Sequence, residues 1–208
     1  MGTKRVGLAR TQALLENLKR EINLSNSTTL KGMNLTVANE SATYGAGMVS
    51  TEIAPQTSIQ TIGGDIVTTM LVDLTALGAK GDAAGDAIGL PAGGAAYLMR
   101  YVTATHGILY KVEVAMLELG AAGSGTIVND FDVRTNSSAA LAYDGACGAN
   151  IIFEGGGAMV KGQSIEDLTT TGGVNNEYVY LTEGATTAST GVYNAGKLVI
   201  KLFGRASF

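Results

Sequence analysis

The chain has 208 residues, of which 46% are hydrophobic and only 15% charged, and its formal net charge is −4. That length fits one ordinary domain, or one domain with an extension, and so small a charged share favours an oligomer or lattice component over a freely exposed monomer. The single cysteine, Cys147, excludes an intramolecular disulfide, and the absence of any run of about 18 apolar residues excludes a membrane-spanning helix.

Glycine is abundant and proline is rare, with 29 glycines against 2 prolines. Disordered chains of biased composition usually combine the two, so this imbalance predicts tight turns between short strands. Val, Ile, Thr and Tyr dominate the segments between the glycines, as pleated sheets favour. The composition therefore predicts a mainly β protein.

Residues 4–24 carry the one clear helical pattern, an apolar stripe spaced by three and four residues. The segment also holds five basic residues against two acidic ones. About three heptads are marginal for an independent coiled coil, so this arm needs a partner, either copies of itself or a groove on another protein. We expect the partner interface to comprise Leu8, Thr11, Leu15, Leu18, Ile22, Arg5, Arg10, Lys19 and Arg20.

Residues 25–62 are rich in Ser, Thr and Asn and have little periodicity. Polar residues directly after the helical stripe end the helix and begin a connection. Short β candidates occur at residues 35–37 and 59–62. We predict an extended polar arm or linker here, between a basic amphipathic helical arm over residues 1–24 and a β domain over residues 63–208.

From residue 63 onwards the apolar period changes to two. In the longest strand candidate, residues 108–119, one face is predicted to carry Ile108, Tyr110, Val112, Val114 and Met116, and the other Lys111 and Glu113. The other strand candidates are residues 66–74, 96–102, 126–133, 150–153, 178–182 and 197–203. About eight strands joined by glycine-marked loops predict an antiparallel β-sandwich or jelly roll preceded by a short helical arm, with a barrel as second choice.

Charge is divided unevenly along the chain. Residues 1–31 hold six Lys/Arg and two Glu, or +4, whereas the remainder holds eight Lys/Arg and sixteen Asp/Glu, or −8. This division favours docking of the basic arm onto the body of another copy or onto an acidic partner. Nucleic-acid binding is the weaker alternative, because the dispersed charges lie on a partly apolar helix without aromatic residues.

Residues that could carry chemistry are few and lack companion motifs. His106 precedes a glycine at the start of the longest strand candidate, which favours a turn or interface role over catalysis. Cys147 lies in a loop of small residues and is interpreted as a buried or loop thiol. No catalytic residue, metal site or cofactor is therefore predicted, and we expect the protein not to be an enzyme.

Two Asp pairs are the most metal-like clusters, Asp82 with Asp86 and Asp130 with Asp132. Calcium requires six to eight oxygen ligands, about the number that several Asp side chains and loop carbonyls supply. Neither pair has the spacing of an EF-hand or of the glycine-aspartate nonapeptide repeat. Turn-forming Asp chemistry is the favoured interpretation, and a calcium site is the alternative.

Several stretches together resemble small virion structural proteins of marine tailed bacteriophages, of the cyanophage type. They are residues 4–21 (KRVGLARTQALLENLKRE), 81–89 (GDAAGDAIG), 107–114 (GILYKVEV), 178–184 (YVYLTEG) and 194–205 (NAGKLVIKLFGR). The resemblance spans most of the chain and is one of texture, since no motif in it has a defined chemical role. It implies a virion component.

Among virion components, the expected compact β body with a reaching arm fits a capsid decoration (cement) protein that clamps neighbouring capsomers, and proteins resembling this layout are commonly homotrimers. The major capsid protein fits less well, because its usual fold needs a long spine helix and only one short helix is expected here. The major capsid protein would then be the partner, with neither nucleic acid nor membrane involved. The expected location is the capsid surface, after assembly in the host cytoplasm. The alternative is a tail, fibre or knob component whose β domain binds host glycans, and a pilus- or surface-layer-like subunit is a third possibility.

Overall fold

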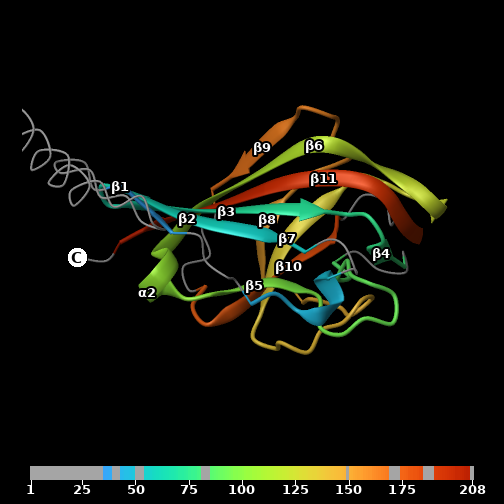
Figure 1. Cartoon of the computed structure of the whole chain (residues 1–208), viewed down its shortest axis with the longest axis horizontal. Coiled ribbons are helices and arrows are strands. Elements are labelled where there is room, and N and C mark those ends of the chain that lie inside the picture. Colours follow the sequence, from blue (N-terminus) through green and yellow to red (C-terminus); the bar gives the residue numbers. More distant parts are fainter. Residues whose placement is uncertain are drawn as a thin grey trace, which may run out of the picture.

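The computed structural model describes residues 35–38, 43–49, 54–80, 85–148, 150–168, 174–184 and 190–206, with backbone only for residues 35–38. Within these residues the chain forms two antiparallel sheets, which confirms the predicted mainly β class (Figure 1). Helical structure in the described part is limited to single turns, η1 (Ala46–Met48) and α2 (Thr103–His106). The predicted N-terminal helix lies outside the described residues.

The larger sheet has seven strands, and β11, the last strand of the chain, lies at its centre between β3 and β6. A short strand, β4 (Gly78–Ala79), also pairs with β11. The path through the other strands runs β1 (Leu35–Ala38), β2 (Gln56–Ile62), β3 (Asp65–Asp73), β11 (Thr190–Arg205), β6 (Ile108–Thr126) and β9 (Ser164–Asp167).

The smaller sheet has four strands and lies on the other side of the core. Its strand order is β5 (Tyr97–Tyr101), β10 (Glu177–Glu183), β7 (Phe131–Asn136) and β8 (Ile151–Glu154). Loop segments extend the hydrogen bonding beyond this sheet: the Ile88 N–H donates to the Leu181 carbonyl of β10, and the Ala96 N–H donates to the carbonyl of Leu141, which is itself a loop residue. Other loop residues, Gly148 and Gly155, hydrogen-bond the buried side chains of Arg134 and Asp132 on β7.

A single hydrophobic core receives side chains from both sheets. In β11, Leu198, Ile200 and Leu202 are at most 1% exposed, while the residues between them point away from the core. β3 shows the same alternation, with Met70 and Val72 fully buried. The predicted alternation of residues 66–74 and 197–203 is thus confirmed, because both strands are regular where they pair.

The predicted core face of residues 108–119 is wrong at its first two positions. β11 pairs Phe203 with Lys111 and Gly204 with Leu109, so Tyr110 is an extra residue in β6. Such a bulge reverses the side-chain directions on one side of it. Leu109 is consequently in the core and only 6% exposed, whereas Ile108 is 54% exposed.

The larger sheet also extends into the segment predicted as a linker. β1 and β2 coincide with the two short β candidates at residues 35–37 and 59–62, and a turn at Gly63 joins β2 to β3. Residues 126–133 were predicted as one strand, but β6 ends at Thr126 and β7 begins at Phe131. The edge strand β9 was not predicted, because four residues give too short a pattern.

Candidate functional site

The residues predicted from sequence to form the partner interface lie outside the described residues, so their arrangement stays a prediction. They are Leu8, Thr11, Leu15, Leu18, Ile22, Arg5, Arg10, Lys19 and Arg20. The described residues show which surface of the β body could receive a partner.

His106 ends the turn α2 and is 3% exposed. Its Nδ1 lies 2.9 Å from the Thr68 hydroxyl oxygen, and its ring centroid lies 5.1 Å from that of Tyr101. Burial lowers the pKa of His106 to about 4, so the imidazole is neutral near pH 7. The Tyr101 hydroxyl donates to the carbonyl oxygens of His106 and Gly107, which fixes the turn against β5.

Cys147 is a buried thiol, 1% exposed, beside the smaller sheet. Burial raises the pKa of its thiol to about 12, so the nucleophilic thiolate is scarce near neutral pH. Its backbone carbonyl accepts a hydrogen bond from the Asn136 side chain at 2.9 Å. These contacts fit the small buried side chain that the sequence indicated.

Asp132 and Arg134 form a buried ion pair on the loop-covered side of the smaller sheet. The Asp132 carboxylate accepts from Arg134 Nη2 at 3.0 Å and from the Gly155 N–H at 3.1 Å, and Arg134 Nη1 donates to the Gly148 carbonyl at 2.9 Å. Both Asp132 oxygens therefore bind protein donors. Among the described residues, which exclude Asp82, no cluster of three or more His, Cys, Asp or Glu could hold a metal ion.

The larger sheet turns one face away from the core, and we call this the outer face. The register aligns its side chains in rows that cross the strands. The first row is Ile62, Asp65, Arg205 and Ile108; the second is Gln60, Val67, Phe203 and Lys111 with the bulged Tyr110; the third is Ser58, Thr69, Lys201, Glu113 and Glu166; the fourth is Gln56, Leu71, Val199, Ala115 and Ser164.

The outer face is richer in apolar side chains than a solvated sheet face requires. Val67 opposes Phe203, and Leu71 opposes Val199, so two apolar pairs lie over the central strands. In the first row of the outer face, the side chains of Ile62 and Ile108 are 52% and 54% exposed. Apolar side chains thus lie in the fourth, second and first rows of the outer face, and the third row between them is polar.

Charged side chains cross the outer face as cross-strand pairs. Lys201 Nζ lies 3.0 Å from the Glu113 carboxylate, and Arg205 Nη2 lies 3.3 Å from that of Asp65. Lys111 Nζ lies 2.9 Å from Glu166, a hydrogen bond that raises the pKa of Lys111, and 4.0 Å from the Phe203 ring centroid. Such exposed pairs add little stability, but they fix the side chains over the sheet.

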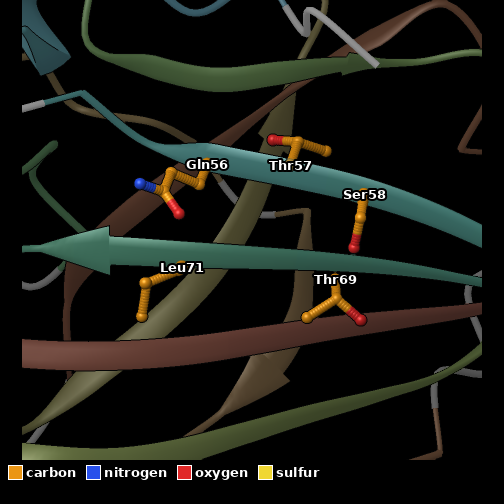
Figure 2. A pocket seen from close by; sticks show the side chains of 5 residues that line it. All are labelled: Gln56, Thr57, Ser58, Thr69 and Leu71. Carbon is orange, nitrogen blue, oxygen red and sulfur yellow. The ribbon is translucent and has the colours of Figure 1, made fainter. Parts of the chain in front are cut away.

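A shallow hollow of about 190 Å³ opens where β2 and β3 lie side by side. Its lining is one amide, three hydroxyls and one apolar side chain, contributed by Gln56, Thr57, Ser58, Thr69 and Leu71 (Figure 2). Four of these residues belong to the third and fourth rows of the outer face. The hollow offers neutral hydrogen-bonding groups without a charged side chain in its lining.

No protein-family model, curated protein or solved structure matches this chain. None of the helices in the described part has the length and apolar character to cross a membrane.

The apolar side chains of the outer face were not predicted from the sequence to form a surface. One signal of this surface was present in residues 197–203, where the apolar Val199 and Phe203 occupy positions that alternate with the core residues and so lie on the opposite face. The apolar pairs of this face arise from strands more than 100 residues apart in the chain, because Val67 pairs with Phe203. Local periodicity cannot indicate such pairs.

Proposed function

We propose that the protein is a bacteriophage virion structural protein, namely a capsid decoration protein whose N-terminal arm clamps neighbouring capsomers. The observation that carries the proposal is the division of the chain into a +4 segment with an apolar stripe and a −8 remainder. The described part of that remainder is a β body with its own core. A body of this kind with a basic amphipathic arm is suited to display and attachment.

The proposed mechanism is passive clamping of the shell. Burial of the apolar arm residues would drive attachment, at about 25 cal/mol for each Å² of apolar surface removed from water. A homotrimer would present three arms at once, so that weak contacts act together through a raised effective concentration. The proposed partners are the major capsid protein and other copies of this chain, without nucleic acid, membrane, cofactor or catalysis, at the capsid surface.

We propose further that the two sheets form a β-sandwich of the jelly-roll type. From β5 to β11 the chain changes sheet repeatedly: β5, β7, β8 and β10 belong to the smaller sheet, and β6, β9 and β11 to the larger one. Crossing between two sheets that share one core supports this assignment. It accords with the proposal that the body is a displayed module.

The test is the copy number of this protein in purified virions, measured by quantitative mass spectrometry against the major capsid protein. Decoration requires on the order of hundreds of copies, because a closed symmetric shell repeats each lattice site. A dozen copies or fewer would contradict decoration and favour a tail component. Substituting Leu15 and Leu18 by Asp in the full chain should weaken binding to undecorated capsids at least about tenfold, whereas Val160→Asp, a change at an exposed loop residue, should not.

The hollow on the outer face supports a second candidate, a tail or fibre module that binds host glycans. The Gln56 amide and the Ser58 and Thr69 hydroxyls next to Leu71 are groups that can pair with sugar hydroxyls, whereas the Thr57 hydroxyl oxygen is buried. Glycan-array binding by the full chain that is lost in Gln56→Ala and Thr69→Ala, yet kept in Val160→Ala, would favour this candidate over decoration.

A further inference from the structure

We propose that the outer face of the larger sheet is the docking site for this chain's own residues 4–24. The proposal shares with the proposed function the prediction that these residues form an amphipathic helix. It names the surface on the β body that the apolar stripe of that helix would cover. The supporting observations are the dimensions of the two surfaces, their apolar content, and the point at which β1 enters the sheet.

The lengths of the two surfaces agree. From Leu8 to Ile22 a helix rises by about 21 Å, at about 1.5 Å per residue. From the Leu71 row to the Asp65 row, six residues along β3 span about 20 Å, at about 3.3 Å per residue. A helix lying along β3 and β11 would therefore place its stripe over the outer face from the fourth row to the first.

The two surfaces are also chemically complementary. The stripe offers three Leu and one Ile, and the outer face offers the pairs Val67 with Phe203 and Leu71 with Val199. Ile62 and Ile108, each more than half exposed, would lie under one end of the helix. Removing aliphatic surface from water is favourable, so covering these two half-exposed residues alone would strengthen docking about tenfold or more.

Charged groups at the border of the outer face fit the basic arm. With Leu8 and Leu15 at equivalent heptad positions, Arg5 and Lys19 both fall beside the stripe, on one side of it. Exposed carboxylates border the apolar side chains: the Glu166 side chain is 64% exposed and that of Asp65 46%. Each of them pairs with one cation of the sheet, Glu166 with Lys111 and Asp65 with Arg205, and its side chain stays at least 46% exposed.

The chain is long enough to bring the arm to this surface. β1 is an edge strand and pairs Leu35 with Ile62, so the chain enters the sheet at the first row of the outer face. The twelve residues from 23 to 34 can span up to about 40 Å when extended. This reach suffices for the outer face of the same copy and for that of an adjacent copy.

Hydrogen exchange of the full chain tests the proposal. In the unmodified protein the amides of residues 8–22 should exchange at least about tenfold more slowly than an unstructured peptide of the same sequence. The double substitution Ile62→Asn and Ile108→Asn should accelerate their exchange at least about tenfold, because it removes apolar contact surface at one end of the site. Val160→Asn, at a 62% exposed position in the loop before β9, is the matched control and should change nothing.

Disulfide trapping supplies a second measurement on the same chain. Leu18→Cys combined with Ile108→Cys should cross-link more readily than Leu18→Cys combined with Val160→Cys, because Ile108 lies on the proposed docking site and Val160 does not. Cys147 should not compete for the cross-link, since it is buried and burial raises the pKa of its thiol to about 12. A cross-link within one chain places the arm on its own body, and one between chains places it on a neighbour; either supports docking.

Three results would overturn the proposal. They are arm amides that exchange as fast as those of the unstructured peptide, protection of the arm that the double substitution leaves unchanged, and equal cross-linking of the two cysteine pairs. Failure to bind capsids with the arm docked would instead contradict decoration alone.

Discussion

The buried His106 makes the free energy of unfolding depend on pH. Burial holds its pKa at about 4 in the folded chain, against 6.5 in the unfolded chain. Above pH 6.5 both states are neutral and the residue contributes no pH dependence. Between pH 6.5 and 4 the unfolded state binds the proton and the folded state does not, so the free energy of unfolding should fall by about 3 kcal/mol in all as the pH falls through this window.

Urea unfolding at pH 7 and pH 4.5 measures this loss, and His106→Gln supplies the comparison. Carboxylates also titrate near pH 4.5, and the variant keeps their contribution while removing that of the imidazole. The variant should therefore lose less stability than the unmodified chain between the two pH values. Equal losses would show that His106 is not held neutral by the fold.

The same residue shows what a sequence can indicate about a site. Gly107 directly after His106 was enough to suggest a turn, and the turn α2 is present. The burial of His106 could not be predicted, because Thr68, whose hydroxyl it meets, lies 38 residues earlier in the chain. Likewise, Asp132 and Arg134 are neighbours along β7, but the loop that donates the Gly155 N–H joins them only in the folded chain.

At the scale of elements, the far ends of β6 and β11 form a ribbon that depends on two glycines facing each other. Gly125 pairs with Gly191, and both have positive φ, +72° and +154°. A Cβ on Gly125 would collide with the Thr190 carbonyl, in a conformation that L residues rarely adopt. Gly125→Ala should therefore destabilise the ribbon by about 1–3 kcal/mol, seen as faster hydrogen exchange of residues 121–126.

Gly123→Ala is the matched control for that substitution. Its Cβ would lie 3.2 Å from the nearest atom, the Val192 carbonyl oxygen, so a small adjustment accommodates it. We expect exchange in the ribbon to change by less than about twofold. If both variants exchange alike, the opposed glycines are not what permits the close approach of the two strands.

Element prediction succeeded where strands are regular and failed where they are not. The predicted alternation of residues 66–74 puts Met70 and Val72 on one face, and the structure buries that face in the core, because β3 pairs without interruption on both sides. The bulge at Tyr110 reversed the faces of Ile108 and Leu109, and nothing in the local pattern marks it. A bulge is specified by the partner strand, here through the pairing of Gly204 with Leu109.

At the scale of the whole molecule, the strand that completes the larger sheet comes last in the described chain. β11 pairs with β3 on one side and with β6 on the other, and its register joins Arg205 to Asp65 across 140 residues. Contacts of such long range must overcome a large loop-closure entropy before they stabilise the fold. The two halves of the larger sheet are therefore joined only when β11 inserts between them.

Removing residues 190–208 should consequently abolish cooperative folding. Without β11, β3 and β6 would each present an unpaired edge, and Leu198, Ile200 and Leu202 would be missing from the core. We expect the truncated chain to lose its near-ultraviolet circular dichroism and to elute as aggregates. Removing residues 207–208, beyond the end of β11, is the control and should leave the unfolding transition in place. A monomeric truncated chain with a sharp thermal transition would show that the smaller sheet and β1–β3 fold without their central strand.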